Sequence, residues 1–414
     1  MFFLMKSTIT ALDFGTSKVV TLIATPRDMG INNCDVLGVG SVQYEGFSNG
    51  EWNNPTEVPA VVKKSIDIAQ AQAGNKHKSS DIYVGVPGEF TYVRVFNVKV
   101  DIQGTDPRVT KEHVEEIFRL ADEYYDQKYS DENGTQYANN SGIIIHRSPA
   151  WFMVDGGKKT FEPIGLKGRE LSAMVCFIVA DECFPAYIEK MFSLLNYRVK
   201  GYFSSLMGQV KLYIQEPERD KVAGMIDMGY LNTDFVIAEG DAIIYQETIP
   251  IGSGHIKAAL SEQLALPMDD NIENLKRQYQ FDIRDENKVY EINSQDSSQI
   301  LRYEQSRLDD IIHPVVDELC NRINEAIETS GCRFSVDSKL YLTGGGISLN
   351  RNARDYVASK LNRNVSEPAK VTINMTEPYF SSAMGLLDVI MTSLKVEGEE
   401  YKGIIGFFKK LFSI

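Results

Sequence analysis

Stretches of alternating and continuous apolar residues are interleaved along the chain with stretches of helical periodicity. Residues 8–24 hold two apolar, β-branched runs on either side of a polar turn at 15–17, which predicts a strand hairpin. Apolar positions recur at helical spacing over 57–73, and the clearest amphipathic helix is expected over 110–127. Further strands are expected at 82–86, 143–145, 151–154 and 171–179, with an exposed loop over 128–142.

The second half of the chain repeats this alternation. Residues 221–249 are typical of three successive strands, and 253–333 are largely helical and charged in pattern. A strand at 339–343 leads into the glycines 344–346, and a helix is expected from about Asn350. Strands and helices in alternation predict the α/β class.

Composition narrows the possible classes of protein. The chain has 414 residues, 43% hydrophobic and 24% charged, which is ordinary for a globular protein with several domains. Its net charge of −14 argues against binding to a nucleic-acid backbone. Five scattered cysteines with no C-x-x-C pair suggest neither a zinc site nor a disulfide framework. No signal peptide and no apolar run of about 18 residues is recognisable, so we expect a cytoplasmic protein.

The turn of the first hairpin carries candidate chemistry. Gly15, Thr16 and Ser17 would let backbone N–H groups approach a phosphate without obstruction by side chains. Lys18 offers a cation for phosphate oxygens, and Asp13 could hold a magnesium ion through water. From the residues alone, a plain hairpin with a glycine turn remains the alternative.

Two later turns resemble this one. Asp227 to Thr233 again places Asp-x-Gly at the end of a strand that enters a hairpin, which suggests two related lobes facing one cleft. Tyr230 and Leu231 are bulky for a turn that approaches a phosphate. The glycines 344–346 could lie against a base or ribose or make a tight connection, and they lack the G-x-G-x-x-G spacing of a dinucleotide site.

These turns, in this order, resemble those of the actin, hexokinase and heat-shock ATPase superfamily, and within it the FtsA family of actin-like bacterial cell-division proteins. The narrower resemblance rests on HisArgSerProAlaTrpPheMetValAspGlyGly at 146–157 and GluProIleGlyLeuLysGlyArgGluLeu at 162–171, which are similar to the distinctive FtsA subdomain. IleProIleGly at 249–252 and ProTyrPheSerSerAlaMetGlyLeuLeu at 378–387 also fit. The similarity runs in order along nearly the whole chain.

The resemblance implies a two-lobed actin-like ATPase fold with an FtsA-type inserted subdomain and a C-terminal amphipathic helix. The implied parts are a first-lobe core (1–87, 172–200 and 370–394), the inserted subdomain (88–171), a second-lobe core (201–252 and 335–369), its outer helical subdomain (253–334), a linker (395–401) and a membrane-targeting helix (402–414).

The resemblance also implies ATP and magnesium as cofactors. The residues that match the family's nucleotide motifs are Asp13, Gly15, Thr16, Ser17 and Lys18 for the phosphates and metal, Asp227, Gly229 and Thr233 for the second phosphate loop, Glu273 and Lys276 for the ribose and base, and Gly344, Gly345, Gly346 and Ile347 for the adenosine. No catalytic residue is named. The chain departs from the family at Tyr230, Leu231, Lys257, Ala259 and Val315. These departures predict a scaffold that is at most a slow ATPase.

The last residues form a separate pattern. On a helix, Ile404, Phe407, Phe408 and Leu411 form one apolar stripe. Ile405 and Phe412 lie beside the stripe, whereas Lys402, Lys409 and Lys410 fall on the opposite face. This arrangement is typical of a helix lying in a membrane interface, and FtsA proteins end in such a helix. A terminal helix packed on the body of the protein is the alternative.

By resemblance, the chain would form filaments on an anionic membrane surface, at the inner face of the cell membrane, and anchor FtsZ together with other division proteins. No nucleic-acid partner is expected. Three alternatives stay open: a PilM-like cytoplasmic platform of type IV pilus assembly, an FtsA paralogue in another membrane process, and a small-molecule kinase.

Overall fold

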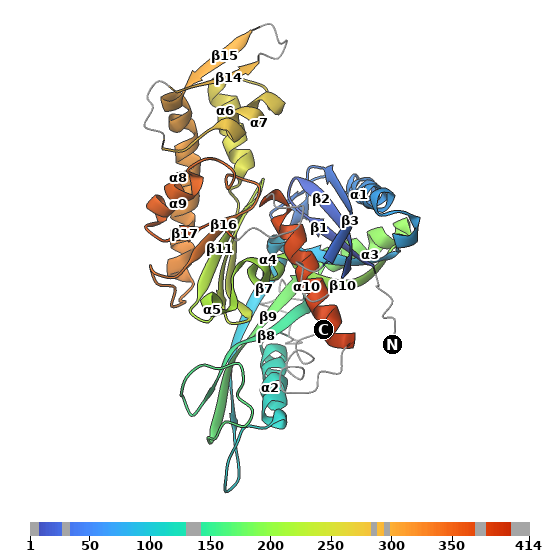
Figure 1. The fold of residues 1–414 in the computed structure, drawn as a ribbon, viewed down its shortest axis with the longest axis vertical. Helices are drawn as coiled ribbons and strands as arrows, with labels where there is room; N and C mark the ends of the chain where they lie inside the picture. The colour runs from blue at the N-terminus through green and yellow to red at the C-terminus, as the bar shows by residue number, and fades with distance from the viewer. Residues whose placement is uncertain are drawn as a thin grey trace.

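Two lobes, each built around a five-stranded sheet, make up the body of the protein in the computed structural model (Figure 1). The structure describes residues 8–26, 34–129, 142–282, 288–293, 299–368 and 378–398. A smaller three-stranded subdomain extends from one end of the molecule, and a helical subdomain with a strand ribbon extends from the other.

The first lobe has the strand order β10-β6-β1-β2-β3. Its strands are β1 (Ile9–Phe14), β2 (Lys18–Pro26), β3 (Cys34–Gln43), β6 (Asp81–Val86) and β10 (Arg198–Ser204). All six residues of β1 are buried, because helices cover both faces of the sheet. Leu12 and Phe14 pack into the core shared with α1 (Val58–Ala73) and α3 (Cys183–Leu195), and Ile9 and Ala11 pack against α10 (Ser381–Gly398).

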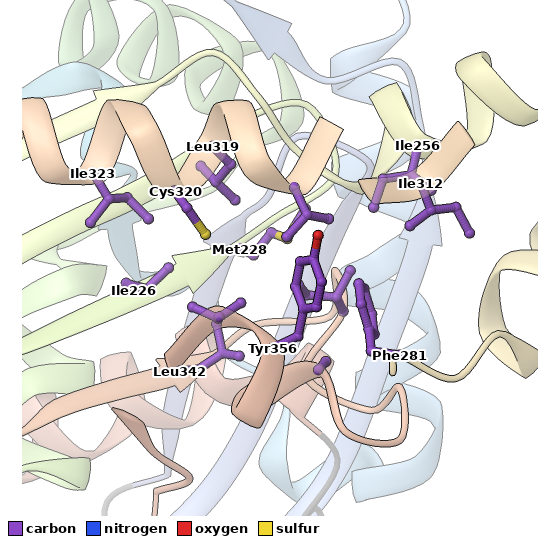
Figure 2. Close-up of a cluster of buried hydrophobic side chains, with 14 of the residues drawn as sticks. Ile226, Met228, Ile256, Phe281, Ile312, Leu319, Cys320, Ile323, Leu342 and Tyr356 are labelled. Atoms are coloured by element: carbon purple, nitrogen blue, oxygen red, sulfur yellow. The ribbon is translucent and has the colours of Figure 1, made fainter. Parts of the chain in front are cut away.

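The second lobe has the order β13-β12-β11-β16-β17. Its strands are β11 (Ala223–Met228), β12 (Thr233–Glu239), β13 (Ala242–Ile249), β16 (Leu340–Thr343) and β17 (Val365–Ser366). Apolar side chains of β11 and β16 face the long helix α8 (Gln305–Thr329), and Tyr356 of α9 (Ala353–Leu361) closes this core beside Phe281 (Figure 2).

The outer part of the second lobe is partly different from the prediction. It contains the expected helices α6 (Ser253–Leu264), α7 (Asp270–Gln278) and α8, and also a two-stranded ribbon of β14 (Val289–Asn293) and β15 (Ile300–Glu304). The prediction of a largely helical region over 253–333 missed this ribbon. Each strand has five residues and alternates exposed with more buried positions, a pattern too short to stand out from the charged helices around it.

The inserted subdomain consists of β7 (Thr91–Asp101), β9 (Glu170–Asp181) and β8 (Gly142–Val154) with α2 (Lys111–Tyr129) packed on the sheet. The helix expected over 110–127 is confirmed. The strands expected at 143–145 and 151–154 are wrong as separate elements, because β8 runs through both of them. Its register shifts near His146 and Pro149, and this irregularity explains the break in the sequence pattern.

Short elements connect these parts. They are β4 (Phe47–Ser48), β5 (Glu51–Trp52), α4 (Ser205–Tyr213), α5 (Glu216–Arg219), and the 3₁₀ turns η2 (Asn75–His77), η3 (Gly88–Phe90) and η4 (Pro378–Phe380). In the described part of the chain, no helix is long and apolar enough to cross a membrane. The amphipathic stripe predicted over 402–414 lies outside the described residues, and α10 is a different helix that precedes it.

Candidate functional site

A cavity of about 480 Å³ lies between the two lobes. Both hairpin turns line it: β1 and β2 meet at the first turn, and β11 and β12 meet at the second. The glycines after β16 and the start of α10 complete its wall. The lining includes the predicted residues Asp13, Gly15, Thr16, Ser17, Lys18, Asp227, Gly229, Glu273, Lys276, Gly344, Gly345 and Gly346.

The first turn is closed by its own backbone, and its carboxylate is held from two sides. The Gly15 N–H donates to the Lys18 carbonyl oxygen at 2.9 Å. Asp13 Oδ1 accepts from Ser205 Oγ at 2.8 Å and from Ser382 Oγ at 2.9 Å. Burial raises the pKa of Asp13, and the two serine hydroxyls oppose that shift. Asp13 is therefore fixed in place at the base of the cavity.

Lys18 brings a cation into the same wall. Burial lowers the pKa of its amine to about 8, and the nearby Asp13 opposes this change. The ammonium lies 4.3 Å from the centre of the Tyr379 ring. The first turn thus places one positive charge in the cavity wall, next to Thr16 and Ser17 of its bend.

The second turn repeats the arrangement on the other lobe. Asp227 Oδ2 accepts from Gln209 Nε2 at 2.7 Å, and burial raises the pKa of this carboxyl to about 6. The Gly229 N–H donates to the Asn232 carbonyl oxygen at 2.9 Å, as in the first turn. Asp234 also lines the cavity, and burial raises its pKa to about 7. Asp13, Asp227 and Asp234 thus share one partly enclosed space, and the charge of Asp13 raises the pKa of Asp227 further.

The two turns touch each other directly. The Leu231 N–H donates to Thr16 Oγ1 at 3.0 Å. Beside this contact, Asn232 Nδ2 donates to Glu89 Oε2 at 2.6 Å. Tyr230, bulky for its position in the turn, packs beside Gly254, where an added Cβ would come within 3.1 Å of the Tyr230 ring. The unusual pair Tyr230 and Leu231 is therefore accommodated by the neighbouring helix α6 and by Thr16.

The far wall combines an ion pair with a glycine turn. Glu273 Oε1 lies 3.1 Å from the buried ammonium of Lys276, and Arg277 pairs with the same oxygen at 2.8 Å. Gly344 has a φ of 90°, and a Cβ there would lie 2.3 Å from Asp227 Oδ1. A Cβ on Gly345 would lie 2.8 Å from that of Tyr379. Glycine is thus required by the packing of the wall itself.

Comparisons of the sequence with known proteins point to the same family over most of the chain. The family model described as cell division protein FtsA matches residues 224–385. Curated relatives called cell division protein FtsA include those of Buchnera aphidicola (23% identical, covering 92% of this chain and 90% of the relative), Rhizobium meliloti (24%, 92% and 86%) and Escherichia coli (23%, 92% and 90%). Over most of its length, this chain is similar to the FtsA cell-division proteins.

Solved structures agree on the fold. A PilM–PilN type IV pilus biogenesis complex matches with a TM-score of 0.59 at 16% identity, over 91% of this chain and 97% of the solved chain. MreB5 of Spiroplasma citri bound to AMPPNP matches with a TM-score of 0.53 at 9% identity, over 95% and 99%. At such identities the likeness concerns the fold alone. The predicted α/β class and the two-lobed actin-like fold are confirmed.

Two residues carried over from the FtsA motifs do not face the cavity. Thr233 is fully buried, and its hydroxyl donates to the Ile251 carbonyl oxygen at 2.6 Å. Ile347 is 2% exposed and packs in the core of the second lobe. The prediction that they line the site is corrected: Thr233 anchors the start of β12, and Ile347 holds the glycine turn onto the core.

Several polar residues of the site were missed by the sequence prediction. Ser205 and Gln209 lie one helical turn apart on α4 and hold Asp13 and Asp227, respectively. Ser382 and Glu89 reach the site from the start of α10 and from η3. Their i, i+4 spacing is the single signal that Ser205 and Gln209 offer, and it is common on any helix.

Proposed function

We propose that the chain binds ATP with magnesium in the cavity between its lobes and serves as a cell-division scaffold that attaches FtsZ to the membrane. The observation that carries the nucleotide proposal is the meeting of two like turns, from opposite lobes, around Lys18 and the carboxyl groups of Asp13 and Asp227. The volume of about 480 Å³ lies within the roughly 300–1,000 Å³ typical of sites for ligands of this size.

Each part of the wall has a role in this proposal. The backbone N–H groups of Thr16 and Ser17 and the Lys18 ammonium would contact the phosphates. Glu273 and Lys276 would lie toward the ribose and base, beside the glycine turn at 344–346. The solved MreB5 structure is bound to AMPPNP, which supports a nucleotide in a fold of this kind.

The donor set fits magnesium held through water. Asp13 and Asp227 supply hard carboxylate oxygens close to the proposed phosphate position, as this cation prefers. Within the described residues, no group of three His, Cys, Asp or Glu side chains is arranged to hold a metal ion directly. When bound, magnesium would neutralise phosphate charge. The chain's own residues would orient the nucleotide and fix the two carboxylates through Ser205 and Gln209.

Membrane attachment rests on the terminal sequence pattern. Full burial of a Phe, Leu or Ile side chain contributes about 1.5–3 kcal/mol, and a lysine near anionic lipid about 1 kcal/mol. Burial in an interface is partial, and ordering a short helix costs free energy, so one copy would bind reversibly. A filament that presents many copies of 402–414 would bind far more tightly without any new contact. Polymerisation and membrane binding would therefore be coupled.

The test is recruitment of FtsZ to anionic vesicles by the full-length chain in the presence of MgATP. We expect FtsZ to sediment with vesicles when the wild-type chain is present and to remain in solution with Phe408→Glu. Ser413→Glu is the matched control, because it adds the same charge on the opposite face of the helix. FtsZ that stays in solution while the wild-type chain sediments would contradict the FtsZ assignment and favour another membrane process.

A PilM-like platform is the second candidate, and the likeness of fold to the PilM–PilN complex is the observation that favours it. A platform of that kind would not depend on lipid affinity of residues 402–414. If the wild-type chain fails to sediment with vesicles, the membrane-scaffold proposal is wrong and the platform becomes the better explanation.

A further inference from the structure

Helix α10 starts in the wall of the cavity and leads toward the C-terminal segment. Pro378, Tyr379, Ser381 and Ser382, at the junction of η4 and α10, all line the cavity. The helix then crosses the first lobe and continues to Gly398 (Figure 1). One element thus connects the candidate site to the part of the chain that carries the amphipathic pattern.

The first turn of α10 is bonded to the carboxylate at the base of the site. Ser382 Oγ donates to Asp13 Oδ1 at 2.9 Å, and this same oxygen accepts from Ser205 on α4. Any ligand or hydrated cation that draws on the charge of Asp13 acts on a carboxylate that is bonded to α10. The strength of the hydrogen bond from Ser382 would change with the negative charge that remains on this carboxylate.

The residue pair before α10 is in contact with the candidate phosphate-binding lysine. The Lys18 ammonium lies 4.3 Å from the Tyr379 ring centre and 5.1 Å from that of Phe380. Tyr379 is 43% exposed and rests on Gly345, which has no room for a side chain. A phosphate group competes with the aromatic face for the ammonium, because an ion pair is the stronger attraction. Binding of a polyanion would therefore loosen the hold of Lys18 on Tyr379.

Helix α10 also packs closely on α4. It crosses α4 where Gly208 faces Gly385, and a Cβ on Gly385 would lie 2.4 Å from the Gln209 backbone nitrogen. Gln209 in turn donates to Asp227 of the second lobe. The crossing of α4 and α10 thus connects α10 to Asp13 and Asp227.

We propose that Tyr379 and Ser382 are positioning residues that couple occupancy of the cavity by a nucleoside triphosphate to the stability of α10. This inference rests on the proposed nucleotide-binding function and extends it. Phosphates that engage Lys18, and a cation that orders Asp13, would change the constraints on the first turn of α10. Occupancy of the cavity would in this way influence the segment that follows the helix.

Hydrogen exchange of the full-length protein tests this coupling. Backbone amides of α10 are followed with and without MgATP, and binding is measured by calorimetry on the same samples so that exchange is compared at saturation. In the wild type we expect MgATP to change exchange in the first turns of α10 by about tenfold, the order expected for one hydrogen bond. Ser382→Ala should reduce this difference to less than about twofold, and Ser382→Thr, which keeps the hydroxyl, should restore it.

Matched variants separate this role from a merely structural one. Ser393→Ala makes the same change on α10 far from the cavity, where the hydroxyl donates to the Val389 carbonyl oxygen at 2.8 Å, and it should respond to MgATP as the wild type does. Tyr379→Leu should reduce the response and tighten MgATP binding, because Lys18 loses its competing partner.

The outcomes distinguish the two claims. If the wild type binds MgATP but α10 exchange does not change, the coupling is wrong and the nucleotide site stands. A full response in both Ser382→Ala and Tyr379→Leu would also overturn the coupling. If the wild type fails to bind MgATP, the proposed function falls and this inference falls with it.

Discussion

Lys18 is a residue of the candidate site whose protonation depends strongly on its surroundings. Its amine is drawn into the wall of the cavity, where burial lowers the pKa to about 8 while Asp13 favours the charged form. A lysine with this pKa is only partly protonated at mildly alkaline pH. Its ability to hold a phosphate therefore depends on pH in an accessible range.

The affinity for MgATP should fall as pH rises above 8. Below that pH the free protein carries a charged Lys18, and above it binding must first protonate the amine, so affinity declines by up to about tenfold per pH unit. Calorimetric titrations between pH 7.5 and 9.5 measure the slope. Lys18→Arg keeps its charge throughout this range, so its affinity for MgATP should not change with pH. Equal slopes for the two proteins would mean that Lys18 does not contact the phosphates.

Asp227 and Asp234 make the opposite kind of prediction, because burial raises the pKa of these carboxyls to about 6 and about 7. The folded state holds protons that the unfolded chain loses from about pH 4 upward. The free energy of unfolding should therefore fall as pH rises from 4 through 6 or 7 and then level off.

Asp227→Asn should flatten part of this decline and raise the free energy of unfolding at pH 7.5 by about 1–3 kcal/mol. The same variant should weaken MgATP binding, because a carboxylate oxygen proposed to face the metal is lost. Urea unfolding at a series of pH values measures the first effect, and calorimetry measures the second. A variant that is less stable than the wild type at pH 7.5 would show that burial of the ionised Asp227 carboxyl does not destabilise the folded protein.

Individual site residues could be predicted from the sequence where they stand at strand ends and turns. Asp13, Lys18 and Asp227 are recognisable because each adjoins a glycine turn after an apolar run. Ser205, Gln209 and Ser382 could not be found, since nothing along the chain says which face of α4 or α10 meets a carboxylate. The partner of Ser205 and Ser382, Asp13, lies 192 and 369 residues away. Thr233 and Ile347 were misplaced because a strand or turn residue next to a site can equally point into the core.

Among the elements, the crossing of α4 and α10 holds the base of the site together. Helix axes come this close only where small residues meet, and here the pair is Gly208 and Gly385. The contact matters beyond packing, because α4 carries Ser205 and Gln209 and α10 carries Ser382.

Gly385→Ala should destabilise the protein by about 1–3 kcal/mol, because a Cβ at this position would lie 2.4 Å from the Gln209 backbone nitrogen and force the helices apart. Urea denaturation measures the change. Ser393→Ala, a substitution of comparable size farther along α10, is the control and should stay within about 0.5 kcal/mol of the wild type. Equal stability of both variants would mean that the crossing is less tight than its geometry indicates.

Elements with strong periodicity could be predicted, and irregular ones could not. The charged first turn and regular apolar stripe of 110–127 predict α2 well. The strand β8 was divided in two because its register shifts around His146 and Pro149 disrupt the alternation. The β14–β15 ribbon was missed because its strands have only five residues each and pair with each other, so their alternation is too short to stand out from the helices around them.

Across the whole molecule, the site exists because two lobes from distant parts of the chain meet. Thr16 accepts a hydrogen bond from the Leu231 N–H, and Gln246 Nε2 donates to the Gly88 carbonyl oxygen at 2.8 Å. The echo of Asp-x-Gly at two turns predicted paired lobes. It could not predict that the turns touch, because the contact joins the Leu231 backbone N–H to the Thr16 hydroxyl, which the spacing of the motifs does not reveal. The bulky Tyr230 lines the cavity and packs beside Gly254.

The most direct test of the account is a calorimetric titration of MgATP into the wild-type protein and Gly15→Asp. The new carboxylate would stand in the cavity wall beside the proposed phosphates, so we expect saturable binding by the wild type and none by the folded variant. Gly156→Asp places the same charge in the open at an exposed, left-handed position of the inserted subdomain and should bind like the wild type. Equal affinity of Gly15→Asp and wild type, or no binding by either, would contradict a nucleotide site between the lobes.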